Sequence, residues 1–479
     1  YQRHELRFAS TTPGQTLTLY ETDYGVGRVS IGTGAAAAAV RTATTALNVD
    51  ASRLKWDLAI AGNDGNNILK GATDNAADNT FIGSLGSDSI DGGTPTEIGF
   101  GSMVGAPGTD SIDYSGLSLR VKVSYSKFGL ATAQKLTPQG AVSGTDQLLN
   151  IDDVIIGTSL NDDISGNAAG NRIIGGLGLD ILNGNGGEDI YEFLKGAEHT
   201  AAEINDTGNP DLPPSSDFSR DKIVFRSTTA GDTLKLFAGD KGIEVIEIGQ
   251  PIDSLIANET DPIALNVDAS AMLSKLTIFG NDGNNNIFGS SLDNTIYGRD
   301  GEDSISGGAG NDFILGDSGN DKINGGDGND IITGGAGSDS LIGGRGLDRF
   351  IFNVQPDQTP FDRIIDFTPG EDKIMLEEQV FNIPNPSGSF NDPRSISEDQ
   401  LLAASGAIAA KTKDQRFIYN TLTGDLRFDQ DGSDSGNQAV VVAMLAPPTG
   451  TSRPAVTAAD ILIYQRLDSL IPFQSSSPI

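Results

Sequence analysis

Acidic residues and their amides recur every nine positions between residues 280 and 351, each within a glycine-rich segment. The sixth position of every nonapeptide unit holds Asn285, Asn294, Asp303, Asp312, Asp321, Asp330, Asp339 or Asp348. Carboxylates spaced this regularly can bind cations, and without cations they repel one another. The pattern therefore raises two alternatives, a cation-binding array or a disordered acidic chain.

The composition of the whole chain helps to decide between a cation-binding array and a disordered chain. The 479 residues include 32 Lys and Arg against 65 Asp and Glu, for a net charge of −33, with 61 glycines. This charge argues against a nucleic acid partner, which requires clustered Lys and Arg, and against an anionic membrane surface. The regular placement of Ile, Leu and Phe argues against disorder.

The eighth position of each unit is apolar throughout, and it indicates which elements position the acids. It holds Ile287, Ile296, Ile305, Ile314, Ile323, Ile332, Leu341 and Phe350. A helix would need a period of 3.6 and fewer glycines. The nine-residue period instead predicts a tight turn followed by a three-residue strand with one side chain pointing inward. Two such units would form one coil of a solenoid.

The units GGDGNDIIT (325–333) and GGAGSDSLI (334–342) resemble the RTX repeats, GGxGxDxUx, of proteins exported by type I secretion. The resemblance implies an all-β chain of tandem calcium-binding parallel β-rolls (β-helix solenoids), with flanking β-strand modules and a small, mainly-β C-terminal domain. It implies several Ca²⁺ ions between successive turns, with the sixth-position Asp as carboxylate ligand. For Asn285 and Asn294 the alternative is capping of the roll, since an amide is a weaker ligand.

The same pattern occurs in two further blocks. Residues 157–192 place Asp162, Asn171, Asp180 and Asp189 at the sixth position. A less regular block, starting at residue 62, offers Asp88 and Asp110 as ligand candidates.

A longer duplication frames these blocks. Residues 5–93 and 222–308 share the segments ALNVDAS and GNDGNN, and ELRFASTTPGQTLTLY matches KIVFRSTTAGDTLKLF. Each copy predicts a strand-rich N-terminal segment followed by a β-roll. The predicted boundaries are a first module at 1–116, a strand segment with a short roll at 117–194, a closing element and linker at 195–221, a second module at 222–352, a roll cap and C-terminal domain at 353–446, and a tail with the secretion signal at 447–479.

Aromatic residues follow the two regular rolls, in IYEF (190–193) and RFIF (349–352), and D-K-I elements come later at 221–223 and 372–374. We expect these aromatics to close the open end of each roll. Ser397–Gln400 has the spacing of a capping box and predicts a short helix through LLAASGA. Residues 416–432 predict a β-hairpin.

A search for catalytic residues finds none. The chain has no cysteine and two histidines, and it lacks HExxH, GxSxG and GxxxxGK[ST]. We expect His199 to lie in an exposed linker. We therefore predict that the chain is not an enzyme.

Three functional hypotheses remain open. The first is a secreted, extracellular structural protein, a subunit of a surface layer, sheath or filament at the cell surface, which self-associates on Ca²⁺ binding. The second is an adhesin that binds a cell-surface glycan or matrix. The third is the RTX carrier portion of a longer secreted enzyme or toxin. No apolar run approaches the roughly 18 residues of a membrane helix, so we expect no membrane insertion.

Overall fold

The computed structural model describes residues 4–31, 44–72, 79–92, 111–125, 131–149, 154–199, 201, 203–206, 220–249, 262–354, 361–381, 383, 388–434, 438–446 and 453–465. The chain divides into two compact units. The first comprises Tyr1–Arg226 and Phe237–Val245, and the second comprises Ser227–Leu236 and Ile246–Ile479. Within the described ranges, no helix has the length and apolar character needed to cross a membrane.

The first unit contains two sheets. The first sheet runs in the order β1 (His4–Phe8), β3 (Val26–Ile31), β5 (Leu58–Ala61), β7 (Asn79–Ile82), β9 (Ser111–Asp113), β13 (Val154–Ile156), β15 (Arg172–Ile174), β17 (Ile190–Phe193) and β18 (Lys222–Phe225). The second runs in the order β2 (Gln15–Thr18), β4 (Leu47–Asp50), β6 (Ile68–Lys70), β8 (Ser89–Asp91), β12 (Val142–Leu149), β11 (Ala131–Leu136), β10 (Arg120–Tyr125), β14 (Asp163–Ser165) and β16 (Ile181–Asn183).

The second unit also contains two sheets. One runs in the order β22 (Thr277–Phe279), β24 (Thr295–Asp300), β26 (Phe313–Ser318), β28 (Ile331–Ala336), β30 (Arg349–Phe352), β32 (Lys373–Glu377), β38 (Ile461–Tyr464) and β33 (Arg394–Ser395). The other runs in the order β19 (Thr233–Lys235), β21 (Asn266–Asp268), β23 (Asn286–Phe288), β25 (Ser304–Ala309), β27 (Lys322–Asp327), β29 (Ser340–Arg345), β31 (Asp362–Ile364), β37 (Val440–Leu445), β36 (Asp425–Phe428), β35 (Phe417–Asn420) and β34 (Leu401–Ala404). Strand β20 (Val245–Ile248) contains the boundary between the units.

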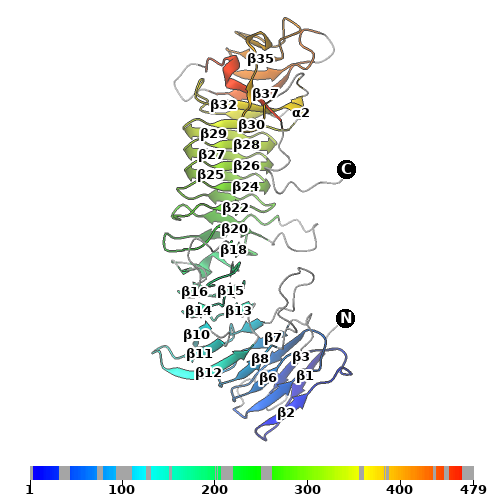
Figure 1. Ribbon diagram of the computed structural model, residues 1–479, viewed down its shortest axis with the longest axis vertical. Helices are drawn as coiled ribbons and strands as arrows, with labels where there is room; N and C mark the ends of the chain where they lie inside the picture. Colours follow the sequence, from blue (N-terminus) through cyan, green and yellow to red (C-terminus); the bar gives the residue numbers. More distant parts are fainter. Residues whose placement is uncertain are drawn as a thin grey trace. The chain divides into compact units, whose positions relative to one another are not determined.

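Residues 277–352 form a parallel β-roll, in which successive strands alternate between the two sheets (Figure 1). Thr295 pairs with Phe313 and Ser304 pairs with Lys322, so two nonapeptides make one coil, as predicted. All eighth-position side chains of this roll are buried. The nearly all-β fold and its parallel rolls confirm the predicted fold class.

The strands in the roll are longer than the predicted three residues. From Thr295 to Arg345 each strand has six residues, because the start of the following turn also pairs with the neighbouring coil. Gly308 pairs with Gly326 in this way, and Ala309 pairs with Asp327. The turns therefore stack in register together with the strands, which brings equivalent turn residues of adjacent coils close together.

The second sheet of the first unit differs from a regular roll because it contains an antiparallel meander. Strands β10, β11 and β12 pair with one another in antiparallel fashion, and β12 and β10 then pair in parallel with β8 and β14 (Figure 1). In the opposite sheet, β9 pairs directly with β13. The meander therefore extends one sheet of the roll by strands that lie outside the nonapeptide pattern.

The predictions for the roll ends and the C-terminal region have mixed outcomes. Phe350 and Phe367 are buried with ring centroids 6.4 Å apart, and Tyr191, Phe193 and Phe352 are also buried, so these aromatics lie in the core. Strand β17 pairs in parallel with β18 and β30 with β32, so the sheet continues past both aromatic strands, and closure of the roll ends stays a prediction. The hairpin is confirmed by the antiparallel pairing of β35 with β36.

The predicted helix after Ser397 is wrong. The capping box forms, with the N–H of Ser397 donating to the side chain of Gln400 at 2.9 Å. It caps a single 3₁₀ turn, η2 (Glu398–Gln400), after which β34 pairs with β35. Sheet pairing of Leu401–Ala404 therefore overrides the local helix signal. The other short helical elements are η1 (Gly196–Glu198), α2 (Glu378–Phe381) and η3 (Ala458–Asp460).

Candidate metal centre

The turns of the roll depend on residues with positive φ at the second and fourth positions of the nonapeptide. In unit 325–333 these are Gly326 (φ 119°) and Gly328 (φ 148°). Among the described residues, three that are not glycine have positive φ, namely Asn185, Arg299 and Asp317, and each occupies a second position. The turn therefore imposes this strained conformation even where glycine is replaced.

The sixth-position aspartates bind the turns of adjacent coils together. One carboxylate oxygen, Oδ1, accepts the backbone N–H of the equivalent residue eighteen positions earlier. Asp321 accepts from Asp303 at 2.8 Å, and Asp330 accepts from Asp312 at 2.8 Å. The same bond joins Asp339 to Asp321 and Asp348 to Asp330. Each aspartate is thus fixed in place by the preceding coil.

The second carboxylate oxygen of these aspartates is buried and accepts no hydrogen bond within the described part of the chain. This is true of Oδ2 in Asp180, Asp303, Asp312, Asp321, Asp330, Asp339 and Asp348. A buried charged oxygen without a partner is costly, since it loses its hydration and gains nothing in return. A run of such oxygens at one repeat position offers a series of sites for a cation.

The first-position glycine opens the space beside that oxygen. A Cβ atom added to Gly316 would lie 2.3 Å from Oδ2 of Asp321 and 2.5 Å from the carbonyl oxygen of Gly334 in the next coil. The corresponding distances at Gly325 are 2.3 Å to Asp330 and 2.7 Å to Gly343. A carboxylate oxygen and a backbone carbonyl oxygen therefore converge there, and only glycine leaves room for them.

Burial raises the pKa of these carboxyl groups. The pKa of Asp303 rises to about 7 and that of Asp321 to about 8; in Asp321 the charges of Asp339 and Asp303 add to the effect. Burial also raises the pKa of Asp330 to about 6. Burial is the main cause of these shifts, and no positively charged group among the described residues offsets it at these three aspartates.

This donor set fits calcium. Ca²⁺ takes six to eight oxygen ligands and accepts carboxylates together with backbone carbonyls. The residues that would hold it are the aspartates with an unpartnered Oδ2, together with glycine carbonyls of the neighbouring coil. A divalent cation would neutralise the carboxylates of adjacent coils in place.

Four other predicted ligands lie in turns that are closed by their own hydrogen bonds. Asn285 accepts the N–H of Asn281 at 3.0 Å, and Asp162 Oδ2 accepts the N–H of Thr158 at 2.6 Å. The same i−4 bond is present in Asn171 and Asn294. Their second-position residues, Asn281, Thr158, Asn167 and Ser290, all lack positive φ. These bonds favour the capping interpretation for Asn285 and Asn294.

Asp88, Asp110 and Asp189 have different positions. Asp88 is buried in the first unit, and its Oδ2 accepts a hydrogen bond from Ser84 Oγ at 2.8 Å. Asp110 lies outside the described residues. Asp189 follows a turn with positive φ at Asn185.

Sequence analysis missed the partners of Asp189. One carboxylate oxygen each of Asp189, Asp206 and Asp221 lie within 4.8 Å of one another, and all three residues are buried. The N–H of Asp189 donates to Asp221 at 2.9 Å, and the N–H of Asp348 donates to Asp372 at 3.1 Å. Asp221 and Asp372 both begin a D-K-I element. The shared D-K-I element was therefore the sequence signal that the stack of hydrogen-bonded aspartates continues beyond the last nonapeptide.

The expectation of an exposed linker at His199 is wrong. The imidazole is 0% exposed, with Nε2 2.9 Å from Asp240 Oδ2 and Nδ1 3.2 Å from Glu203 Oε2. Burial alone would lower the pKa of His199, but the two carboxylates outweigh it and raise the pKa to about 9. The charged imidazole is thus a structural cation in the first unit. The sequence around His199 has no regular spacing of apolar residues, so it did not predict that the histidine is buried.

Comparison with known families agrees with this geometry. The family model for the RTX calcium-binding nonapeptide repeat matches in four copies, over residues 73–94, 156–191, 278–314 and 315–350. No curated protein matches the chain. The matched segments lie in both units and include the stacked aspartates of the second unit. RTX nonapeptide repeats bind Ca²⁺, and four copies imply several ions, so both units of the chain contain RTX calcium-binding nonapeptide repeats.

Proposed function

We propose that this protein is a secreted structural protein, a subunit of an extracellular surface layer, sheath or filament, that folds and assembles when it binds calcium. RTX repeat proteins are typically secreted, which supports an extracellular location. The observation that carries the proposal is the stack of buried, unpartnered Asp Oδ2 atoms from Asp303 to Asp348. A roll with this many uncompensated charges needs calcium to fold.

The ion concentration then decides where the protein folds. Extracellular calcium modules have dissociation constants of about 10⁻⁴–10⁻³ M, far above free cytosolic calcium. Binding to the folded form alone adds RT ln(1+[L]/Kd), which is about 1.4 kcal/mol per independent site at tenfold excess. In the cytosol the calcium-dependent roll of the second unit would stay unfolded, which suits export. Several coupled sites outside the cell would make folding a steep function of calcium.

Electron microscopy of the purified chain in millimolar calcium and in excess chelator tests the structural role. Regular polymers that form in calcium and disperse in chelator are the expected result. Dispersed monomers under both conditions would contradict assembly, while circular dichroism on the same samples would still report calcium-dependent folding. The two parts of the proposal can thus fail separately.

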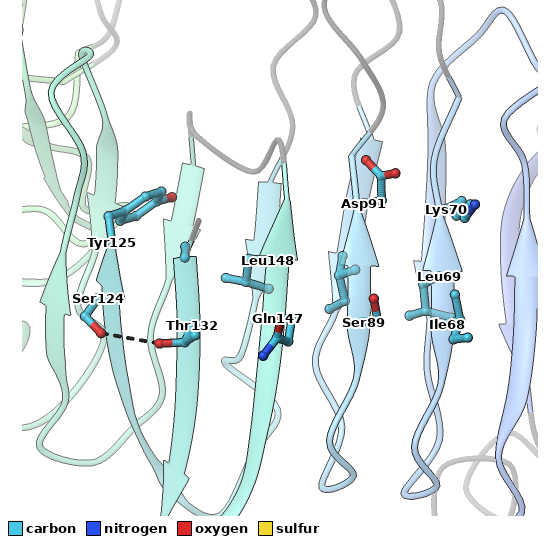
Figure 2. A pocket seen from close by; sticks show the side chains of 12 residues that line it. Ile68, Leu69, Lys70, Ser89, Asp91, Ser124, Tyr125, Thr132, Gln147 and Leu148 are labelled. Carbon is cyan, nitrogen blue, oxygen red and sulfur yellow. Dashed lines mark hydrogen bonds between the residues drawn. The ribbon is translucent and has the colours of Figure 1, made fainter. Parts of the chain in front are cut away.

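An adhesin is the second candidate, and a hollow in the first unit favours it. The hollow has a volume of about 510 Å³ and is lined by β6, β8, β10, β11 and β12 (Figure 2). Its lining includes Lys70, Asp91 and Gln147 as well as the hydroxyl pair Ser124 and Thr132, whose oxygens are 3.4 Å apart. Such mixed donors and acceptors suit a polar ligand such as a glycan.

Binding of the full chain to a glycan array in millimolar calcium tests this second candidate. We expect a selected glycan to lose affinity for the Gln147→Ala variant and to keep it for Gln134→Ala, which changes a residue of β11 outside the hollow. Absence of any bound glycan would remove this candidate. The carrier portion of a longer enzyme or toxin stays a further alternative, which the length of the gene tests.

A further inference from the structure

A lysine side chain is completely buried at the meander of the first unit. Lys135 lies on β11, and its Nζ donates to the carbonyl oxygen of Gly86 and to Oδ1 of Asp146, both at 2.5 Å. Oδ2 of Asp88 lies 3.6 Å from the same nitrogen. The side chains of Lys135 and Asp146 are 0% exposed, and that of Asp88 is 1% exposed.

Asp88 and Asp146 stack on each other in the same way as the sixth-position aspartates of two adjacent coils in the regular roll. The N–H of Asn67 donates to Asp88 Oδ1 at 2.8 Å, and the N–H of Asp88 donates to Asp146 Oδ1 at 2.9 Å. The second bond has the same form as the bond from Asp303 to Asp321 in the regular roll. Asp146 comes 58 residues after Asp88, on a strand outside the nonapeptide pattern.

The donor atoms around Lys135 match those of the regular turns. In the second unit a carboxylate oxygen and a glycine carbonyl oxygen of the next coil converge beside four first-position glycines, Gly298, Gly307, Gly316 and Gly325. At the meander, the carboxylates of Asp88 and Asp146 and the carbonyl of Gly86, a fourth-position glycine, supply the same kinds of oxygen, but here an ammonium group of the chain itself contacts them. The Tyr114 hydroxyl satisfies the remaining oxygen of Asp146 at 2.8 Å.

We propose that the Lys135 ammonium group replaces a calcium ion at the junction between Asp88 and Asp146. A covalently attached cation cannot dissociate, so this junction folds without calcium, whereas the turns from Asp303 to Asp348 require it. Removing the ammonium group uncovers a latent calcium site formed by Asp88, Asp146 and the Gly86 carbonyl. This inference concerns the first unit and does not depend on the structural role proposed above.

Hydrogen exchange of the unmodified full chain in excess chelator is the first test. Backbone amides of β11 and β12 should stay protected, while amides of β25 to β29 should exchange rapidly. Loss of protection in β11 and β12 at the same calcium concentration as in β25 to β29 would overturn the proposal. No variant is needed for this comparison, so misfolding cannot obscure it.

Calcium stoichiometry of the Lys135→Met variant is the second test, with calcium chloride as the only added ligand. Methionine keeps the length and apolar stem of the side chain but removes its charge. Equilibrium dialysis should find one more calcium ion per chain than in the unmodified protein, and protection of β11 and β12 should become calcium-dependent. An unchanged ion count would overturn the proposal.

Two further variants serve as controls. Lys122→Met changes the partly exposed lysine of neighbouring β10, whose Nζ pairs with Asp163, and should alter neither readout. Lys135→Met combined with Asp146→Asn removes one cation and one anion together. It should bind no additional calcium and keep β11 and β12 protected in chelator; an additional ion in this double variant would contradict the assignment of Asp146 to the latent site.

Discussion

The backbone N–H of Asp303 donates a 2.8 Å hydrogen bond to Oδ1 of Asp321, which lies eighteen residues later on the next coil. The other oxygen of Asp321 is buried and has no hydrogen-bond partner among the described residues. One carboxylate therefore has two separable roles. Oδ1 holds the coils in register, and Oδ2 is available to a cation.

Asp321→Asn should separate these roles, because an amide oxygen can still accept the N–H of Asp303 but carries no charge. We expect the calcium midpoint of folding to rise several-fold. Loss of one site at tenfold excess calcium corresponds to about 1.4 kcal/mol. Calcium titration followed by circular dichroism measures the shift. Asp327→Asn, at an exposed third position, is the matched control, and an equal shift in both variants would argue against a ligand role for Asp321.

The regular roll could be predicted from the sequence because its period is strict. Turn and strand both repeat every nine residues, so the inward column from Ile287 to Phe350 and the register of eighteen follow directly. Which sixth positions leave an oxygen for a metal could not be predicted in this way. That depends on φ at the second position, where Arg299 and Asp317 adopt the same conformation as glycine, while Asn281 instead closes its turn with a hydrogen bond.

The rest of the site escaped prediction because its contacts are distant in sequence and lack a period. Asp146 lies on an antiparallel strand and accepts the N–H of Asp88, and Lys135 on the adjacent strand donates to Asp146. His199 finds its partner Asp240 41 residues away. The nonapeptide pattern identifies only residues that follow it, so charges supplied by inserted segments are visible only in three dimensions.

Gly325→Ala tests the space beside the carboxylate. The added Cβ would lie 2.3 Å from Oδ2 of Asp330 and 2.7 Å from the Gly343 carbonyl oxygen, so both oxygens must move. We expect a destabilisation of about 1–3 kcal/mol, as for other overpacked sites, together with a raised calcium midpoint. Calcium titration and thermal unfolding measure these two effects.

Gly406→Ala is the appropriate comparison for that variant. Gly406 has φ of 70° and no atom within 4 Å of an added Cβ, so alanine there causes backbone strain without crowding. It should lower the thermal stability and leave the calcium midpoint unchanged. A lowered stability with an unchanged midpoint in Gly325→Ala as well would mean that the first-position glycine serves only the backbone.

Removal of calcium should unfold the second-unit roll in the full chain. In excess chelator, buried carboxylates such as Asp312 and Asp330 have no compensating charge in the described part of the chain, and we expect amides from Thr295 to Arg345 to lose protection from hydrogen exchange. Millimolar calcium should restore protection. Equal magnesium should not, because Mg²⁺ demands near-octahedral geometry and gives up its water reluctantly. Full protection in chelator would contradict the metal requirement.

The stability of the first unit should fall at alkaline pH because of His199. Its pKa is raised from 6.5 to about 9 by hydrogen bonds to Asp240 and Glu203, which outweigh the opposing effect of burial. A raised pKa in the folded state contributes stability that is fully present below pH 6.5 and is lost as pH rises towards 9. The shift corresponds to on the order of 3 kcal/mol.

Denaturant unfolding at saturating calcium, between pH 6 and pH 10, measures this loss. His199→Gln keeps two hydrogen-bonding groups but cannot carry the charge, so it should be less stable at pH 6 and should show a smaller decline between pH 6.5 and 9; the decline that remains comes from carboxyl groups such as Asp180 and Asp221, whose pKa values burial raises. His4→Gln changes the other histidine, which is exposed, and should retain the decline. If His199→Gln declined with pH as steeply as the unmodified protein, then the imidazolium between Asp240 and Glu203 would not be the group that titrates.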